Sequence, residues 1–215
     1  MPYTWTDNLY PFLRDLIEQE GAKPNVSTLR LLANQGLRII SRRTGLYEQA
    51  WSNATPGGAL TLVGASCLLP EDCYRVDRVE WGNSDTELPY RSTRWLDTYQ
   101  PGWREDHGEP SYHTRTGRYL LLSSIPVASP SGKLIVRGAG ALPDFSDDPL
   151  EENPLQWFQS DYQLLPAYYV LAELPADPQN PKQALRSQKY AAYWQAGLAE
   201  LTAAVAARAT ERFEY

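Results

Sequence analysis

The chain has 215 residues, of which 42% are hydrophobic and 21% charged, so it can bury the core of one large domain or of a domain with an inserted subdomain. Its formal net charge of −6 disfavours a protein that grips nucleic acid, because such proteins set clustered Lys and Arg against the phosphates. The sequence has no apolar run long enough for a membrane span, and its first residues do not resemble a secretory signal.

The aromatic content is high, with seven Trp and fourteen Tyr. These residues suit either a tyrosine-rich core or a surface for protein–protein contact, and the composition leaves both open. Cys67 and Cys73 have no histidine nearby, so their spacing indicates neither a zinc site nor a disulfide framework. We expect both to be reduced, structural thiols.

The N-terminal part of the chain predicts two helices. Apolar side chains recur at helical spacing over residues 9–17, and Gly21 is a suitable stop. Ser27 or Thr28 is expected to cap a second amphipathic helix, which ends near Gly45. Its last turn carries arginines, the favourable sign of charge at a helix C-terminus.

The middle of the chain predicts strands, because its segments are short, β-branched or aromatic, and bounded by turn residues. The expected strands are residues 59–63, 74–81, 87–92, 110–115, 118–124 and 133–138. Turn residues after Trp81 and after Arg115 predict hairpins, so the segment is expected to form a small antiparallel domain. Residues 94–110, rich in Trp, Asp and Gly, are expected to form a long loop or a short helix.

The C-terminal part begins with an acidic connector and continues as helix. Residues 143–157 contain five carboxylates and neither Lys nor Arg, which is typical of a solvated connection. Helical spacing then starts at Phe158, with Pro166 near the start of the helix or at a kink. A long helix is expected from about Lys182 to Arg212. Its Ala-rich last third buries little area, so it packs closely or depends on a partner.

These elements predict an α+β fold, in which N-terminal and C-terminal helices form one bundle with a small antiparallel β-domain inserted between them. The expected parts are N-terminal bundle helices over residues 1–58, the β-domain over 59–142, the acidic connector over 143–157, and C-terminal bundle helices with a docking tail over 158–215.

Catalytic chemistry has little support in the sequence. His107 and His113 are the only histidines, and the acids beside His107 lie in a segment expected to be a loop, so the structural interpretation is favoured. There is no phosphate-binding loop, dinucleotide fingerprint or nucleophile elbow. We therefore expect no catalytic residue, no metal ligand and no cofactor. Arg38, Arg42 and Arg43 cluster on the second helix, where charge complementarity to the helix end is favoured over contact with DNA.

A series of short segments in the middle of the chain resembles a known family. The segments are Leu69-Pro70-Glu71-Asp72, Val76 to Trp81, Gly108 to Tyr112, Gly117 to Leu120, Ile125-Pro126 and Leu134 to Val136. Their order is similar to that of the β-domain of head-to-tail adaptor (connector) proteins of tailed bacteriophages. The element order resembles the family over about residues 5 to 205. The sequence departs from the pattern after Tyr90, where a Trp-rich loop follows.

The resemblance implies a structural protein of the virion neck, between the capsid portal and the tail, made in the host cytoplasm. Such proteins form a ring, usually of twelve subunits, beneath the portal. The implied partners are the portal protein, tail or nozzle proteins and further copies of the chain. Duplex DNA is expected to pass through the lumen without specific binding, which suits an acidic protein.

Two contact regions follow from the resemblance. The C-terminal tail is expected to dock on the portal through Arg208, Arg212, Phe213 and Tyr215. The β-domain and its loop are expected to meet the tail through Trp95, Trp103 and Tyr112. The expected tail-side contacts lie where the sequence departs from the family pattern.

Three other interpretations stay open from the sequence. The chain could be another neck or tail-completion protein of the virion, although tail-tube proteins are mostly β. It could be a small hydrolase, which requires that His107 or His113 has a carboxylate partner in a pocket. It could also be a non-viral helical interaction module.

Overall fold

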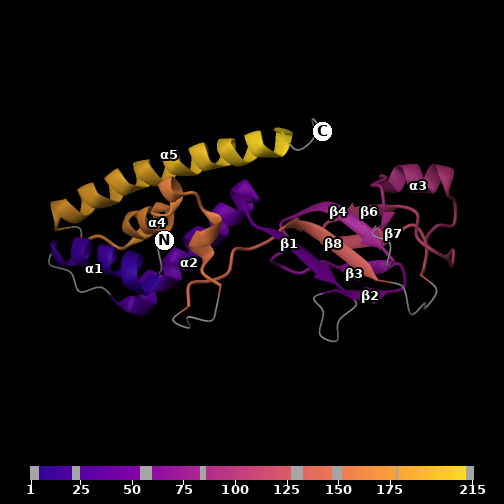
Figure 1. The fold of residues 1–215 in the computed structure, drawn as a ribbon, viewed down its shortest axis with the longest axis horizontal. Coiled ribbons are helices and arrows are strands. Elements are labelled where there is room, and N and C mark those ends of the chain that lie inside the picture. Colours follow the sequence, from indigo (N-terminus) through magenta and orange to yellow (C-terminus); the bar gives the residue numbers. More distant parts are fainter. Residues whose placement is uncertain are drawn as a thin grey trace. The chain divides into compact units, whose positions relative to one another are not determined.

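The structure is a computed structural model that describes residues 5–20, 25–53, 60–82, 86–126, 133–146, 152–177 and 179–211. It combines helices with antiparallel sheets, which confirms the predicted α+β class. The chain divides into two compact units (Figure 1). The helical unit comprises Met1–Tyr47 and Ala141–Tyr215, and the β-unit comprises Glu48–Gly140.

The helical unit is built around two N-terminal and two C-terminal α-helices. Its elements are η1 (Trp5–Leu9), α1 (Tyr10–Glu18), α2 (Val26–Thr44), η2 (Pro154–Trp157), η3 (Ser160–Tyr162), α4 (Leu165–Glu173) and α5 (Pro181–Glu211). α4 packs against both α2 and α5, so segments from the two ends of the chain share one core. None of the helices in the described ranges is long and apolar enough to cross a membrane.

At the ends of α2, the predicted N-cap is wrong and the predicted stop is confirmed. The N-cap is Asn25, not Ser27 or Thr28, because the extended Asn25 backbone lets its side chain accept the amides of those two residues. At the other end Gly45 adopts a left-handed conformation with φ of 64°. Its amide donates to the Ser41 carbonyl, which ends the helix as predicted.

The first of the two C-terminal α-helices, α4, begins later than the sequence pattern indicates. The periodic stretch from Phe158 begins with one 3₁₀ turn, η3, and regular helix starts only at Leu165. Pro166 lies in the first turn of α4, where its missing N–H costs no helical hydrogen bond. The long α5 agrees with the predicted helix to within one residue at each end.

Close packing and one buried ion pair hold the helical unit. Gly36 faces the Tyr169 side chain, and a Cβ there would lie only 3.1 Å from the Tyr169 ring. Arg186, at the start of α5, is 4% exposed and donates to the Glu20 carboxylate at 2.6 Å and to the Leu174 carbonyl at 3.2 Å. These bonds join the ends of α1 and α4 to α5.

The β-unit contains two four-stranded antiparallel sheets. One sheet has the order β1 (Glu48–Ser52), β8 (Leu134–Ala139), β4 (Arg75–Trp81) and β5 (Thr86–Glu87). The other has the order β2 (Thr61–Val63), β3 (Ser66–Leu68), β7 (Tyr119–Leu122) and β6 (His113–Thr116). The hairpin after Arg115 is confirmed by the β6–β7 pairing, and β4 and β5 also pair as a hairpin.

Both sheets of the β-unit contribute to one hydrophobic core. Trp51, Trp81 and Val136 come from the first sheet, and Leu120 and Leu122 come from the second. The same core contains the two cysteines, which are free buried thiols. Burial raises the pKa of the Cys67 thiol and raises that of Cys73 to about 11.

Some predicted strands are shorter than expected, and two were missed. The stretch 87–92 forms only the end of β5 and then an isolated parallel bridge between Tyr90 and His113. β1 and β3 were not predicted, because Glu48–Ser52 is polar at most positions and Ser66–Leu68 is only three residues long. The stretch expected as a long loop or short helix contains both, with α3 at Thr93–Tyr99 followed by a loop.

Candidate interaction surfaces

The α3 segment carries a cluster of aromatic side chains around one arginine. The helix starts at an N-cap serine, Ser92, whose hydroxyl accepts the Trp95 amide at 3.2 Å. The Trp95 ring centroid lies 5.1 Å from that of Tyr99 and 5.2 Å from that of Tyr112. The Arg91 guanidinium lies 5.2 Å from the Trp95 centroid and 5.4 Å from the Tyr112 centroid, within cation–π range. We name Arg91, Trp95, Tyr99 and Tyr112 the α3 patch.

Trp103 has a different environment from the α3 patch, because its side chain is only 1% exposed. Its indole N–H donates a hydrogen bond to Asp97 Oδ1 at 2.9 Å, and the same oxygen accepts a hydrogen bond from the Arg104 guanidinium at 2.9 Å. Arg104 also lies over the indole ring, 4.4 Å from its centroid. The bond from Trp103, followed by the nearby Arg104 charge, lowers the pKa of Asp97. Trp103 thus anchors the loop that follows α3.

The predicted tail-side residues therefore divide into two roles in the structure. Trp95 and Tyr112 are brought together, edge to face, at the partly exposed α3 patch. Trp103 is buried beneath its own loop. The sequence did not indicate Arg91 or Tyr99 as members of the cluster, although the helical spacing of Trp95 and Tyr99 was available as a signal.

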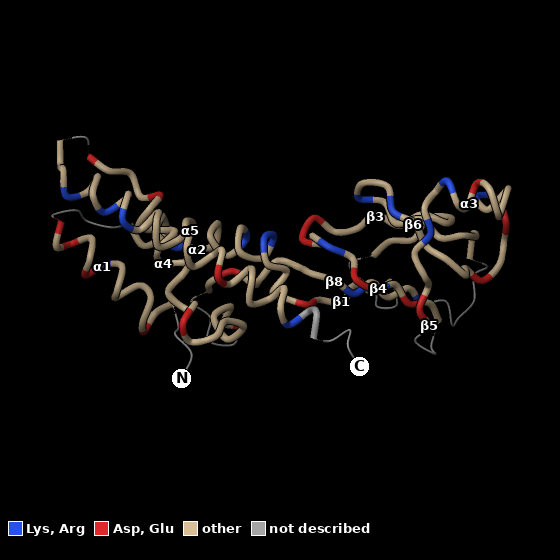
Figure 2. The backbone as a smooth tube through the Cα atoms, turned by 90° about the horizontal axis from the view of Figure 1, so that it is seen from above, with Lys and Arg blue, Asp and Glu red and all other residues tan. Residues whose placement is uncertain are grey.

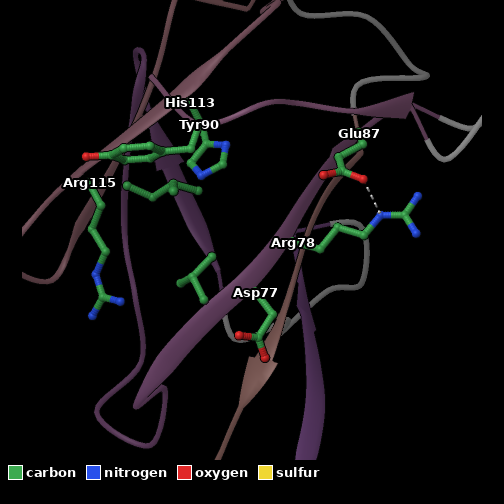
Figure 3. Close-up of a pocket in the computed structure, with 8 residues that line it drawn as sticks. Asp77, Arg78, Glu87, Tyr90, His113 and Arg115 are labelled. Atoms are coloured by element: carbon green, nitrogen blue, oxygen red, sulfur yellow. Dashed lines mark ion pairs between the residues drawn. The ribbon is translucent and has the colours of Figure 1, made fainter. Parts of the chain in front are cut away.

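A cavity of about 230 Å³ lies in the β-unit, lined by residues of both sheets (Figure 3). Its labelled lining residues are Asp77, Arg78, Glu87, Tyr90, His113 and Arg115. Both carboxylates are ion-paired, Asp77 with Arg75 at 2.5 Å and Glu87 with Arg78 at 3.4 Å. The charges of the cavity wall are thus largely balanced within the β-unit.

His113 is the buried histidine of that cavity. Its Nδ1 lies 2.7 Å from the Leu88 carbonyl oxygen, which can only accept, so Nδ1 carries the proton of the neutral ring. Burial lowers the pKa of His113, although this carbonyl and the Glu87 charge act in the opposite direction. The bond at Nδ1 goes to backbone and not to a carboxylate, so the geometry required for a His-dependent hydrolase is not formed at this nitrogen.

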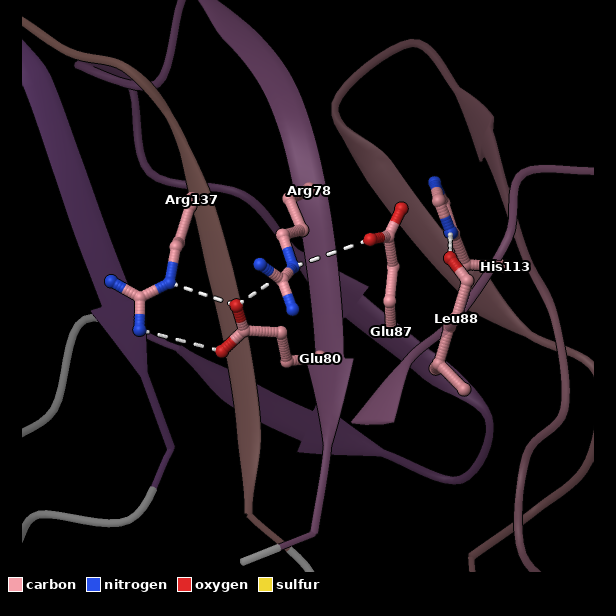
Figure 4. A network of polar contacts seen from close by, with 6 residues as sticks. All are labelled: Arg78, Glu80, Glu87, Leu88, His113 and Arg137. Carbon is pink, nitrogen blue, oxygen red and sulfur yellow. Dashed lines mark hydrogen bonds and ion pairs between the residues drawn. The ribbon is translucent and has the colours of Figure 1, made fainter. Parts of the chain in front are cut away.

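A buried carboxylate fastens the first sheet of the β-unit (Figure 4). Glu80 on β4 is 2% exposed. It accepts Arg137 of β8 at 2.9 Å and lies 3.0 Å from the Arg78 guanidinium, which extends on to Glu87 at 3.4 Å. Two guanidiniums compensate the desolvated carboxylate, so the network binds β8, β4 and β5 together.

Basic residues form no continuous track over the described residues, and Figure 2 shows Lys and Arg interspersed with Asp and Glu along both units. On α2, Arg38 pairs with Asp144 at 3.0 Å, and Arg42 and Arg43 lie in the last turn of the helix. Their position agrees with a role in complementing the helix end.

The predicted portal-docking tail lies mostly beyond the described part of the chain. Arg208 is exposed near the end of α5. Arg212, Phe213 and Tyr215 fall outside the described residues. The last α5 residue counted in the core is Leu201, with Val205 packed against it, so the end of the helix extends past the core of its own unit.

Among the described residues, no set of three or more His, Cys, Asp or Glu side chains is placed to hold a metal ion. The molecule instead presents an aromatic, arginine-bearing surface on one unit and a long helix that runs past its core on the other. These are features of a protein that assembles with other proteins.

The comparison with known families agrees with this description. The SU10 adaptor protein family matches residues 10–213, nearly the whole chain, and the chain therefore belongs to this family of phage head-to-tail adaptors. The resemblance seen in the sequence is confirmed. The family is a structural one and not a class of enzymes, and membership implies a place in the virion neck with portal and tail components as neighbours. No curated protein matches the chain.

Proposed function

We propose that the chain forms a ring of twelve copies beneath the portal, which extends the DNA channel and gives the tail a platform. The family match over residues 10–213 is the observation that carries this proposal. The net charge of −6 supports it, because a channel wall that attracted phosphates would retard the passage of DNA.

Within this ring the helical unit acts as a bundle of N-terminal and C-terminal helices that carries the inserted β-unit. The packing of α4 against both α2 and α5 supports the bundle, since the two ends of the chain supply one core. The α3 patch, with Trp95 and Tyr112 at its centre and Trp103 anchoring the loop, faces the tail components. The aromatic side chains of the α3 patch suit a surface that contacts another protein.

The C-terminal segment docks on the portal through Arg208 and the residues that follow it, Arg212, Phe213 and Tyr215. The Ala-rich end of α5 supports this role, because it extends past Leu201, the last residue of α5 in the core of its unit. A helix end that buries so little area within its own subunit gains stability from a partner.

The experiment is mass photometry of the full chain, alone and mixed with its cognate portal, together with a variant truncated from Ala206 onward. We expect ring-sized species with the full chain, and a folded truncated protein that no longer binds portal. Portal binding retained by the truncated variant would contradict the docking role of the segment. A full chain that stays monomeric and ignores the portal would overturn the ring itself.

A further inference from the structure

We propose that the α3 patch recognises an acidic segment of a tail component, whose carboxylates pair with Arg91 and with the adjacent Arg94 while its apolar side chains cover Trp95 and Tyr99. This inference rests on the proposed adaptor function, which turns the α3 patch toward the tail, and it names the chemistry of the partner.

The first observation is a difference among the arginines of the β-unit. Most of them are neutralised within the chain, each by a carboxylate within 3.1 Å. These are Arg75 with Asp77, Arg78 and Arg137 with Glu80, Arg104 with Asp97, and Arg118 with Glu71. Arg91 and Arg94 are exposed, and neither has a carboxylate partner within the ranges that the structure describes. In a protein of net charge −6, two such cations on one segment mark a local surface for negative charge.

The second observation is that Arg91 is already held in position. Its guanidinium lies over the faces of Trp95 and Tyr112, and it donates to the Tyr90 carbonyl oxygen at 3.1 Å. A planar guanidinium stacked in this way keeps other N–H groups available for a bidentate carboxylate. Because these contacts already restrain the Arg91 side chain, less conformational entropy is lost when a partner docks.

The third observation is the composition and support of the α3 patch. Tyr99 is 68% exposed, and Trp95 is only partly buried. Tyr, Trp and Arg together are the residues that most often dominate binding energy at protein interfaces. On the same helix Leu96 is buried at 0% exposure, and Asp97 is bonded to Trp103, which is 1% exposed, so the helix that carries the patch is itself anchored.

A protein partner fits these observations better than a nucleic acid. Nucleic acid is held by a run of cations that follows successive phosphates. Here the two arginines are followed along the same segment by the carboxylates of Asp97, Glu105 and Asp106. Such a localised positive surface suits one or two carboxylates of a folded or extended protein segment.

The test uses the full chain labelled with ¹⁵N and two short synthetic peptides, one rich in Glu, Asp and Tyr, the other with Gln and Asn replacing the acids. The indole N–H signal of Trp95 is identified with a Trp95→Phe variant. We expect the acidic peptide to shift the Trp95 signal, and the shift to weaken with added salt. The neutral peptide should bind about tenfold more weakly, because it lacks charge-assisted hydrogen bonds.

Matched variants separate the contribution of Arg91 from general charge. Arg91→Gln should lower the affinity for the acidic peptide about tenfold, the loss typical of a charged hydrogen bond at an interface. Arg118→Gln, which removes an arginine already paired with Glu71, should leave the affinity unchanged. Arg91→Glu should favour a lysine-substituted version of the peptide.

Equal binding of the acidic and neutral peptides, or no shift of the Trp95 signal, would overturn the inference. A larger shift with oligothymidine than with the acidic peptide would identify nucleic acid as the ligand instead. Mass photometry of wild-type protein with portal keeps this result apart from the adaptor function. If wild-type protein forms rings but does not bind the acidic peptide, only the inference is rejected. If wild-type protein forms no ring, the adaptor function is rejected.

Discussion

His113 shows how one buried side chain couples the stability of the β-unit to pH. It is 8% exposed, its Nδ1–H is bonded to the Leu88 carbonyl, and burial lowers its pKa below the ordinary value of 6.5. The unfolded chain therefore takes up a proton at a higher pH than the native protein does. The stability that His113 contributes is fully present above pH 6.5 and is lost as pH falls through the folded pKa.

We predict that His113→Asn, whose amide can still donate to the carbonyl, reduces the fall in unfolding free energy between pH 6.5 and pH 5. The slope that a single proton adds is at most about 1.4 kcal/mol per pH unit. Urea unfolding at a series of pH values measures it. His107→Gln is the matched control, because His107 is the exposed histidine of the same unit. Identical slopes in His113→Asn and wild type would contradict the coupling.

At the scale of elements, the pairing of β4 with β8 depends on one glycine. The register of this pair shifts between Val76 and Arg78, where β4 has one more residue, Asp77, than β8. Gly138 lies opposite the bulge, and a Cβ on it would overlap the Arg75 carbonyl oxygen. Since the obstructing atom belongs to the backbone, no side-chain rotation can relieve the overlap.

We predict that Gly138→Ala destabilises the protein by about 2 kcal/mol or more, because it forces β4 and β8 apart in the centre of the sheet. Thermal or urea unfolding measures the loss. The control is Gly117→Asn, since that glycine has φ of 59° with no atom within 4 Å of an added Cβ, and Asn tolerates this conformation. A near-neutral Gly138→Ala would show that the sheet can relax at the bulge.

Prediction from the sequence succeeded for elements whose local signal agreed with their tertiary role. α2 and α5 carry long helical periodicity, and the glycine that ends α2 was recognised from its position. Prediction failed where a partner strand decides the outcome. β1 is recruited by β8 through the register Glu48↔Ala139 to Ser52↔Ile135, a pairing that no local pattern encodes.

The contact surfaces show the same division between local and tertiary signals. Trp95 and Tyr112 were identified as tail-side contacts through the family resemblance. Their meeting depends on the bridge between Tyr90 and His113, which brings the start of α3 beside β6. Arg91 was missed, since its role comes from two rings that are 17 positions apart in the chain, 95 and 112. The burial of Trp103 likewise follows from tertiary contacts.

At the scale of the whole molecule, the β-unit is an insertion whose two ends meet. Glu48, its first residue, pairs with Ala139 of β8, so the Cα atoms lie about 5 Å apart. The unit has its own core, to which both sheets contribute. In the helical unit, Ser41 and Asn34 of α2 accept the amides of Leu142 and Phe145, which fix the returning chain without using the β-unit.

We therefore predict that each unit folds when separated from the other. The fragment 48–140 should give a dispersed NMR spectrum and cooperative urea unfolding, because Trp51, Trp81 and Val136 and the Glu80 network all lie within it. The complementary protein, in which Tyr47 is joined to Ala141 by a short Gly-Ser linker, should keep its helical circular dichroism, since the ends to be joined are already adjacent. A fragment that unfolds gradually would show that the sheets need the helical unit. Gly138→Ala in the fragment serves as the control, because only a folded β4–β8 pair is sensitive to the contact of that Cβ, whereas residual structure is not. Independent folding would allow an adaptor to change its tail-side surface by mutation in the β-unit while the helices that carry the proposed portal-docking segment stay intact.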